Sequence, residues 1–468
     1  MADNNAFPGM VTDPRHGLSF PSRVDWSRFS RELPQWYDDA IFGIFIHWGP
    51  YSVPAWSEPI GAVGEFDVAY LLKHCPYSEW YANTIRISGS LAGEHHHEVW
   101  NDRNYDDFLD MWTAENFDAN QWLELFEDIG ADYVIPTTKH HDGVTLWDAP
   151  ETGDRNSVHR GPKRDLIGEL AEATQRAGLT FGVYYSGGLD WHVRPSAPID
   201  HAITTTEEAR PQDFDYGAFA VRHCQDLIDR YHPKVLWNDI GWPDESKFED
   251  TPGSLSALFD YFYDKVPDGV INDRWGVPHS DYVTSEYSQG LDRQGAGKPW
   301  EHCRGIGWSF AYNQNETAAD MLTGRDIARE IVDKVSRGGR LLLNIGPDQS
   351  GKIPEIQQQP LRDLGTWMRG AKPHLLGVRP SAPESTGAKD TWLREMKAAD
   401  GATLLAVDKV TPERIRVTEN VTVDFTGPAA TATPEAVAGI GVVENCGGNR
   451  WRATIDAESQ GPLLLRFR

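Results

Sequence analysis

The chain has 468 residues, with 44 basic and 70 acidic side chains, so its formal net charge is −26 at pH 7. So acidic a surface repels phosphate groups, which argues against nucleic acids and anionic membranes as partners. A neutral ligand such as a sugar remains compatible with this charge. Hydrophobic residues make up 40% of the chain and 18 residues are tryptophan, enough for a large core with aromatic rings left over for a binding cleft.

The cysteines and the N-terminus narrow the class of protein further. The four cysteines are scattered without a C-x-x-C pair, so neither a zinc site nor a disulfide framework is expected. The first 17 residues lack the basic and apolar stretches of a signal peptide, and no segment is long and apolar enough to span a membrane. We therefore expect a soluble cytoplasmic protein, whereas the sequence indicates no oligomeric state.

The chain repeats a helix-to-strand unit. The apolar run at 41–46 predicts a strand buried on both faces, ending on His47. Asp118 can cap a helix that ends at Gly130, and a strand is expected at 131–138. Further strands are expected at 179–185, 235–236, 270–275, 281–286 and 341–346.

Strands that alternate with helices over about 300 residues predict a parallel α/β barrel. Several connections after residue 240 are too short for full helices, so we expect an irregular (β/α)8-like barrel over residues 1–380. From Pro373 on, short apolar runs separated by turns predict a small β-sandwich over 381–468. Its runs lie at 404–407, 415–417, 421–423, 440–443 and 463–465.

Residues at the carboxyl ends of barrel strands face the active site. Asp239 lies at such an end, flanked by Trp237 and Trp242. A carboxylate beside aromatic rings suits a sugar, whose C–H faces stack on rings while its hydroxyls take hydrogen bonds. We expect Asp239 to be the nucleophile of a glycosidase, with a solvated turn aspartate as the alternative. The other strand ends supply His47, His140, His141, Tyr184, Trp237, Arg274 and Glu286.

Six motifs stand out, at 42–49, 79–81, 139–143, 184–186, 237–239 and 338–347. Together, over about residues 36 to 376, they resemble the α-L-fucosidases of glycoside hydrolase family 29. The resemblance implies a retaining exo-α-L-fucosidase that hydrolyses terminal α-L-fucosyl residues of glycans or glycosides through a covalent fucosyl-enzyme intermediate. It implies no cofactor and no metal.

The resemblance also implies roles for single residues. Asp239 falls on the family's nucleophile and Glu286 on the acid/base of one branch. Because the acid/base position varies among branches, Glu79 is a rival for Glu286. The positions expected to contact or adjoin fucose are His47, Glu79, Trp80, His140, His141, Tyr184, Trp237, Arg274 and Phe310.

Two other functions stay open at this point. The first is a metal-dependent hydrolase on the same barrel, with His47, His140 and His141 as ligands. The second is a sugar-binding protein without catalysis, against which the intact Asp239 argues. The Glu-His-His-His-Glu run at 94–98 is not expected to bind metal, because consecutive side chains point in different directions and zinc pairs favour wider spacings.

Overall fold

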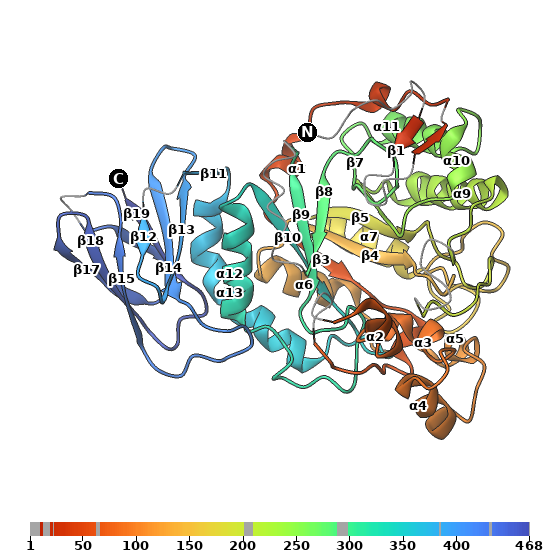
Figure 1. Ribbon diagram of the computed structural model, residues 1–468, viewed down its shortest axis with the longest axis horizontal. Coiled ribbons are helices and arrows are strands. Elements are labelled where there is room, and N and C mark those ends of the chain that lie inside the picture. The colour runs from red at the N-terminus through yellow and green to blue at the C-terminus, as the bar shows by residue number, and fades with distance from the viewer. Residues whose placement is uncertain are drawn as a thin grey trace.

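The computed structural model describes residues 10–12, 19–21, 23–61, 66–200, 209–287, 298–382, 385–429 and 433–467. Of the 17 N-terminal residues that lack a signal-peptide pattern, only 10–12 are among them. Figure 1 shows a curled parallel sheet surrounded by helices and, beside it in blue, two antiparallel sheets formed by the end of the chain. None of the described helices is long and apolar enough to cross a membrane.

The parallel sheet has eight strands in the order β7-β6-β5-β4-β3-β10-β9-β8, which confirms the predicted barrel class. Nearly every strand residue is buried, as expected for strands covered on both faces. The strands are β3 (Phe42–Ile46), β4 (Tyr133–Lys139), β5 (Thr180–Ser186), β6 (Val235–Asp239), β7 (Val270–Ile271), β8 (Val283–Glu286), β9 (Trp300–Gly305) and β10 (Gly339–Ile345).

The barrel is irregular where β7 and β8 meet, at the two ends of the strand order. The connection between them, residues 272–282, contains no helix, as expected for several connections after residue 240, whereas two other connections contain helices at Leu255–Lys265 and Gly324–Val335. Two aspartates bridge this seam. Ile271 N donates to Asp281 Oδ2 at 2.8 Å, and Thr284 donates from N and Oγ1 to Asp273 Oδ1 at 3.0 and 2.7 Å.

Local signals place the helices as predicted in the first half of the barrel. The Asp118 side chain accepts a hydrogen bond from Asn120 N and caps α6, and Gly130 follows the helix at φ +76°. The helices around the barrel are α6 (Ala119–Asp128), α7 (Leu166–Arg176), α9 (Phe214–Tyr231), α10 (Asp244–Phe248), α11 (Leu255–Lys265), α12 (Gly324–Val335) and α13 (Glu355–Leu375).

The excursion between β3 and β4 is largely helical. Within 85–110, Ser90 caps α4 by accepting a hydrogen bond from Gly93 N at 3.0 Å. The elements of the excursion are α2 (Val68–Lys73), η3 (Ser78–Trp80), α3 (Tyr81–Thr84), α4 (Leu91–Trp100) and α5 (Asp107–Met111).

Three strand expectations were wrong or incomplete. The strand expected at 270–275 ends at Ile271 because the seam begins there. Residues 415–417 form no strand, since Arg414 is bonded to the barrel instead, from its N to Asp326 Oδ2 at 2.9 Å. Strand β9 was not anticipated, because its sequence Trp-Glu-His-Cys-Arg-Gly looks polar although all six residues are buried.

The C-terminal sheets form the predicted β-sandwich, with strand orders β11-β13-β14-β19-β16 and β12-β15-β18-β17. Alternate residues of both sheets, such as Leu405, Phe425 and Trp451, fill the space between them. We propose that residues 381–468 form the second domain together with β11. The strands are β11 (Arg379–Pro380), β12 (Thr386–Gly387), β13 (Thr391–Lys397), β14 (Thr403–Lys409), β15 (Val421–Thr426), β16 (Glu435–Ala438), β17 (Gly441–Gly447), β18 (Arg450–Ile455) and β19 (Leu463–Phe467).

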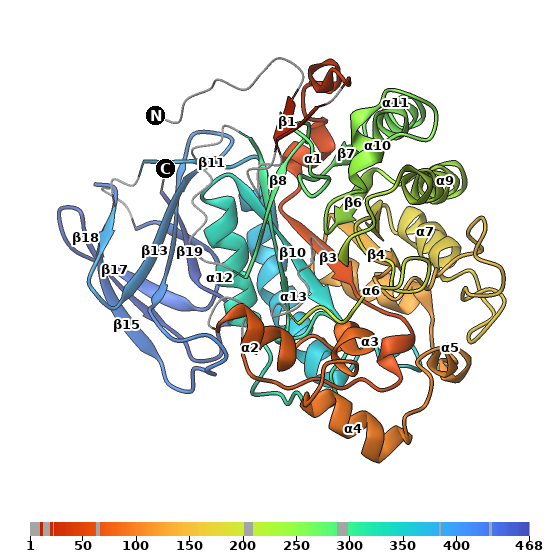
Figure 2. The same cartoon turned by 45° about the vertical axis from the view of Figure 1, so that its right-hand side comes forward.

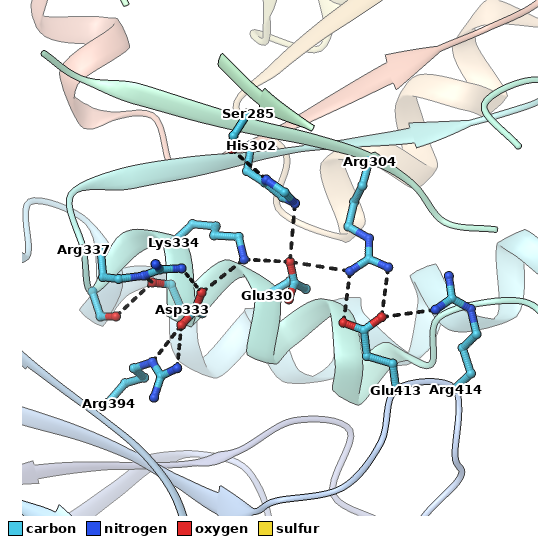
Figure 3. A network of polar contacts seen from close by, with 11 residues as sticks. Ser285, His302, Arg304, Glu330, Asp333, Lys334, Arg337, Arg394, Glu413 and Arg414 are labelled. Carbon is cyan, nitrogen blue, oxygen red and sulfur yellow. Dashed lines mark hydrogen bonds and ion pairs between the residues drawn. The ribbon is translucent and has the colours of Figure 1, made fainter. Parts of the chain in front are cut away.

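Helices α12 and α13 lie between the barrel strands and the sandwich (Figures 1 and 2). Charged side chains from both parts meet along α12. Arg304 of β9 donates to both carboxylate oxygens of Glu413 at 3.1 and 2.9 Å, and Arg394 of β13 donates to Asp333 at 2.7 Å (Figure 3). A rich set of ion pairs therefore fixes the sandwich against the barrel.

Candidate active site

The structure brings the expected site residues together at the mouth where the carboxyl ends of the barrel strands meet. Asp239 ends β6, Glu286 ends β8, and Arg274 follows β7. The ring of His47 lies 5.3 Å from that of Tyr184, whose hydroxyl contacts Asp239. The residues that share this mouth are His47, His140, His141, Tyr184, Trp237, Asp239, Arg274, Glu286 and Phe310.

The carboxylate of Asp239 is buried and is bonded at both oxygens. Tyr184 Oη donates to Oδ2 at 3.0 Å, and Arg274 Nη1 donates to Oδ1 at 3.0 Å. Burial alone would raise the pKa of Asp239, but the charge of Arg274, the neighbouring His141 and the two hydrogen bonds lower it below its ordinary value. Asp239 is therefore ionised near neutral pH and fixed in orientation, as an attacking carboxylate must be.

A single guanidinium links the two carboxylates singled out from the sequence. Arg274 Nη1 contacts Asp239, while Nη2 donates to Glu286 Oε2 at 2.8 Å and Nε donates to Thr284 Oγ1 at 3.1 Å. The guanidinium carbon also lies 4.5 Å from the ring centroid of Trp237, within cation–π distance. All three nitrogens of the Arg274 guanidinium are hydrogen-bonded, and one face of its plane packs on Trp237. The side chain therefore holds Asp239 and Glu286 beside each other.

A tight turn follows Asp239 directly. Ile240 has φ +60° and Gly241 has φ +79°, and a β-branched residue such as isoleucine rarely adopts this left-handed conformation. Gly188 N donates to the Asp239 carbonyl at 3.1 Å, and a Cβ atom on Gly188 would overlap the carbonyl of Ile240. Glycine is therefore required at 188 so that the loop after β5 can approach the end of β6 and support the turn.

Hydrogen bonds behind the mouth set the tautomers of two histidines. Asn344 Nδ2 donates to the Phe310 carbonyl, so Asn344 Oδ1 accepts from His47 Nδ1 at 2.6 Å. Ser186 Oγ donates to the Leu189 carbonyl and accepts from His141 Nδ1 at 2.7 Å. In both neutral rings Nε2 then carries the lone pair and can accept a hydrogen bond from a hydroxyl.

Burial keeps all three mouth histidines neutral. It lowers the pKa of His47 to about 4 and that of His141 to about 3, and it lowers the pKa of His140 well below its ordinary value. His140 stacks on Tyr184 with a centroid distance of 5.7 Å and lies 4.0 Å from the ring of His141. The three rings therefore form an uncharged polar wall that suits sugar hydroxyls.

Glu79 and Trp80 come from η3 and lie beside the mouth residues, Glu79 next to the Phe310–Ala311 segment and Trp80 next to His141. Glu79 is 2% exposed, and its Oε2 accepts from Ala311 N at 2.9 Å and from Ser309 Oγ at 3.3 Å. Burial raises the pKa of Glu79 to about 7. Trp80 packs edge-on against His141, with ring centroids 5.2 Å apart. Both residues thus adjoin the mouth, and Glu79 can carry a proton near neutral pH.

Two charged residues behind the mouth, Lys139 and Glu301, were given no role by the sequence analysis. Lys139, within the Lys-His-His-Asp-Gly motif, points away from the mouth and donates to Asp190 Oδ2 at 2.9 Å, both side chains being fully buried. Glu301 of β9 lies inside the barrel and accepts from Trp237 Nε1 at 2.9 Å. The motif itself was a signal for Lys139, whereas Glu301 lies in the strand that was not recognised.

The histidine run at 94–98 is part of α4, and its side chains diverge as expected. His95 stacks on Trp56 with a centroid distance of 4.7 Å, whereas His97 contacts Asp102 at 2.8 Å. Within the part of the chain that the structure describes, no three His, Cys, Asp or Glu side chains are grouped as metal ligands would be.

A carboxylate pair among neutral donors and aromatic walls, at the carboxyl end of a parallel barrel, defines the site of a glycoside hydrolase. A family model described as "Alpha-L-fucosidase" matches residues 19–372. The chain therefore belongs to the α-L-fucosidase family, in agreement with the resemblance of its motifs.

Individual relatives support this membership. The α-L-fucosidase of Branchiostoma floridae is 32% identical over 436 residues, covering 88% of each chain. That of Dictyostelium discoideum is 33% identical over 360 residues, covering 75% of this chain and 73% of its own. The crystal structure of Thermotoga maritima α-fucosidase superposes with a TM-score of 0.78 at 37% identity, covering 95% of this chain and 99% of that chain.

Proposed function

We propose that this α-L-fucosidase is a retaining exo-enzyme that removes terminal α-L-fucosyl residues from glycans or glycosides. The observation that carries the proposal is the guanidinium of Arg274, which contacts Asp239 at 3.0 Å and Glu286 at 2.8 Å at once. A retaining mechanism needs two carboxyl groups about 5–5.5 Å apart, and carboxylates on adjacent nitrogens of one planar guanidinium are compatible with that spacing.

In the first step, the ionised Asp239 attacks the anomeric carbon of the fucosyl group. The glycosidic C–O bond breaks, its electron pair goes to the leaving oxygen, and Glu286 donates a proton to that oxygen. Tyr184 and Arg274 orient Asp239 through their hydrogen bonds of 3.0 Å each. The product of this step is a fucosyl ester of Asp239 and a free aglycone.

In the second step, water attacks the anomeric carbon and Glu286 accepts its proton. The ester C–O bond breaks and its electron pair returns to Asp239. Esterification has meanwhile removed the negative charge of Asp239, so the guanidinium of Arg274 can pair with Glu286 alone. Arg274 can therefore pair with whichever of the two carboxyl groups is ionised at each stage of the cycle.

The walls of the mouth support fucose as the sugar. The neutral rings of His47, His140 and His141 can exchange hydrogen bonds with hydroxyls, and Phe310 supplies an apolar surface 5.0 Å from His47. Thermotoga maritima α-fucosidase has been solved in complex with fucose and with a mechanism-based inhibitor. Trp80 packs on His141, with ring centroids 5.2 Å apart, and adds an aromatic ring to this site.

The experiment is hydrolysis of an aryl α-L-fucoside followed by proton NMR. Retention predicts that α-L-fucose appears first and that the β anomer grows in later by mutarotation. Glu355→Gln, at an exposed ion pair with Arg362, serves as the matched control. Initial release of the β anomer would show inversion and overturn the mechanism, and absence of turnover would overturn the proposed function.

A further inference from the structure

Glu301 is a fully buried carboxylate in the interior of the barrel, below the catalytic mouth. Its Oε1 accepts a hydrogen bond from Trp237 Nε1 at 2.9 Å. Its Oε2 accepts from Tyr133 Oη at 2.6 Å and from Tyr37 Oη at 3.4 Å. Each oxygen is thus occupied, and the partners come from three separate elements, β6, β4 and α1 (Gln35–Asp39).

A buried arginine offsets the cost of placing this carboxylate in the barrel. Arg340 of β10 is 3% exposed, and its guanidinium carbon lies 3.8 Å from the ring centroid of Tyr37. Burial raises the pKa of Glu301, while the hydrogen bonds from Tyr133 and Trp237 and the charge of Arg340 oppose that rise. A carboxylate this deeply buried is tolerated when its oxygens are hydrogen-bonded and a positive charge lies nearby, and Glu301 has both.

The ring that Glu301 anchors touches both donors of the nucleophile. Arg274 lies over the Trp237 ring at 4.5 Å, and Tyr184 stacks on it with a centroid distance of 5.6 Å and an interplanar angle of 23°. These are the two side chains that hydrogen-bond to Asp239. The indole of Trp237 therefore packs against both side chains that hydrogen-bond to Asp239.

We propose that Glu301 is a positioning residue for the nucleophile, acting through Trp237 on Arg274 and Tyr184. The inference rests on the proposed role of Asp239. Without an acceptor below it, the buried N–H of Trp237 would lose its hydrogen bond, and the ring would turn toward another acceptor. The donors above the ring would shift with it, and Asp239 would lose part of the interactions that keep it ionised.

A positioning role and a purely structural role predict different results for two substitutions. Glu301→Gln and Glu301→Leu both remove the negative charge that faces Arg340, but glutamine keeps an oxygen acceptor for Trp237 Nε1. We expect Glu301→Leu to lower kcat about 10²-fold, because small misplacements of reacting groups cost that much. We expect Glu301→Gln to stay within about fivefold of the wild-type kcat, because its hydrogen bond to the indole persists.

The second readout is the pH profile of kcat/KM. Because the pKa of Asp239 is lowered, we expect the acid limb of the wild-type profile to lie below the range of an ordinary aspartate. Glu301→Leu should move this limb upward by about one pH unit, whereas Glu301→Gln should move it far less. Tyr133→Phe, which removes another donor of Glu301 but leaves the indole contact, should leave the limb in place.

Asp408→Asn is the matched control for lost stability. Asp408 is 1% exposed and accepts from Arg325 Nε at 2.9 Å at the sandwich interface. Its substitution should lower Tm without moving the acid limb. If Glu301→Leu does not fold, Trp237→Phe removes the same hydrogen bond from the other side and should shift the limb likewise.

Two outcomes separate failure of this inference from failure of the proposed function. If Asp239→Gly is inactive while neither Glu301→Leu nor Trp237→Phe moves the acid limb, the positioning role of Glu301 is overturned and the mechanism stands. If Asp239→Gly keeps near-wild-type activity, the assigned nucleophile is wrong and the inference falls with it.

Discussion

The molecule contains two networks of buried charges that differ in how many cations lie beside each carboxylate. At the interface between barrel and sandwich, Glu330 lies 2.9 Å from Lys334, 3.7 Å from Arg304 and 3.9 Å from His302 (Figure 3). Although burial acts to raise the pKa of Glu330, these neighbours lower it to about 2. Two cations, Lys334 and Arg304, thus flank one carboxylate, while burial lowers the pKa of His302 to about 3.

At the mouth of the barrel, by contrast, carboxylates outnumber the cations. The single guanidinium of Arg274 serves both Asp239 and Glu286, and Glu79 accepts hydrogen bonds from the neutral groups Ser309 Oγ and Ala311 N. Burial therefore prevails at Glu79 and raises its pKa to about 7. The interface cations thus lower the pKa of Glu330, whereas at the mouth Arg274 lowers the pKa of Asp239 but burial raises that of Glu79.

The largest expected effect comes from removing the ionised carboxylate of the mouth. Asp239→Gly should lower kcat at least about 10⁴-fold, since covalent catalysis needs the attacking group, while substrate binding persists. Azide should restore part of the rate by entering the vacated space. Steady-state kinetics on an aryl α-L-fucoside measure both. Near-wild-type turnover of the variant would contradict the role of Asp239.

The next effect concerns which mouth carboxyl group donates the proton. Glu286→Ala should slow substrates with poor leaving groups about 10³-fold, because those need protonation of the leaving oxygen. Activated aryl fucosides, which need little protonation, should be slowed far less. Comparison of kcat/KM across a series of leaving groups measures this dependence. If Glu79→Ala shows the dependence and Glu286→Ala does not, the role belongs to Glu79.

Substitutions at the interface between barrel and sandwich should change the free energy of unfolding and leave kcat unchanged. Glu330→Gln leaves Lys334 and Arg304 without their shared carboxylate, which should lower the free energy of unfolding by about 3 kcal/mol. Because the pKa of Glu330 is lowered, its contribution is present above pH 4.5 and is lost as the pH falls through about 2. The variant should therefore lose less stability than the wild type over that range.

Denaturant unfolding between pH 2 and pH 7 measures this difference. Glu355→Gln, at the exposed ion pair with Arg362, is the matched control and should change stability by less than about 1 kcal/mol. A reduced kcat of folded Glu330→Gln at neutral pH would contradict the separation of the two networks.

The same contrast explains how far the sequence predicts this structure. Strands made of apolar runs, such as 41–46, and capped helices, such as the one after Asp118, were recovered because their signals are local. Strand β9 was missed because its polar residues are buried by partners far away in the chain. Glu301 contacts Trp237 of β6, and Arg304 contacts Glu413 of the sandwich.

The residues of the candidate site were easier to predict than the buried residues packed behind them. His47, Asp239 and the other mouth residues fall at strand ends within recognisable motifs. Glu301, by contrast, lies one contact behind the mouth, where no local pattern distinguishes a positioning carboxylate from an exposed one. Likewise, the motif containing Lys139 was recognised, yet its buried pairing with Asp190 depends on the packing of two loops.

The smallest expected effect tests whether Glu79 is a proton carrier of the mouth or part of its neutral wall. Glutamine resembles the protonated carboxyl group, so Glu79→Gln should keep kcat/KM within about tenfold of wild type at pH 5–6 if Glu79 only contacts substrate. Glu79→Gln also tests the protonation of Glu79 through stability. The pKa of Glu79, raised to about 7, lies above its ordinary 4.5, so the folded state binds a proton on Glu79 more tightly than the unfolded state does. The contribution of Glu79 to wild-type stability is therefore fully present below pH 4.5 and is lost as the pH rises through 7. This pH dependence should vanish in Glu79→Gln. Parallel pH series of kcat/KM and of denaturant unfolding measure both effects. A loss of activity of about 10²-fold or more at pH 5–6, comparable to general acid catalysis, would instead show that Glu79 donates a proton in the reaction.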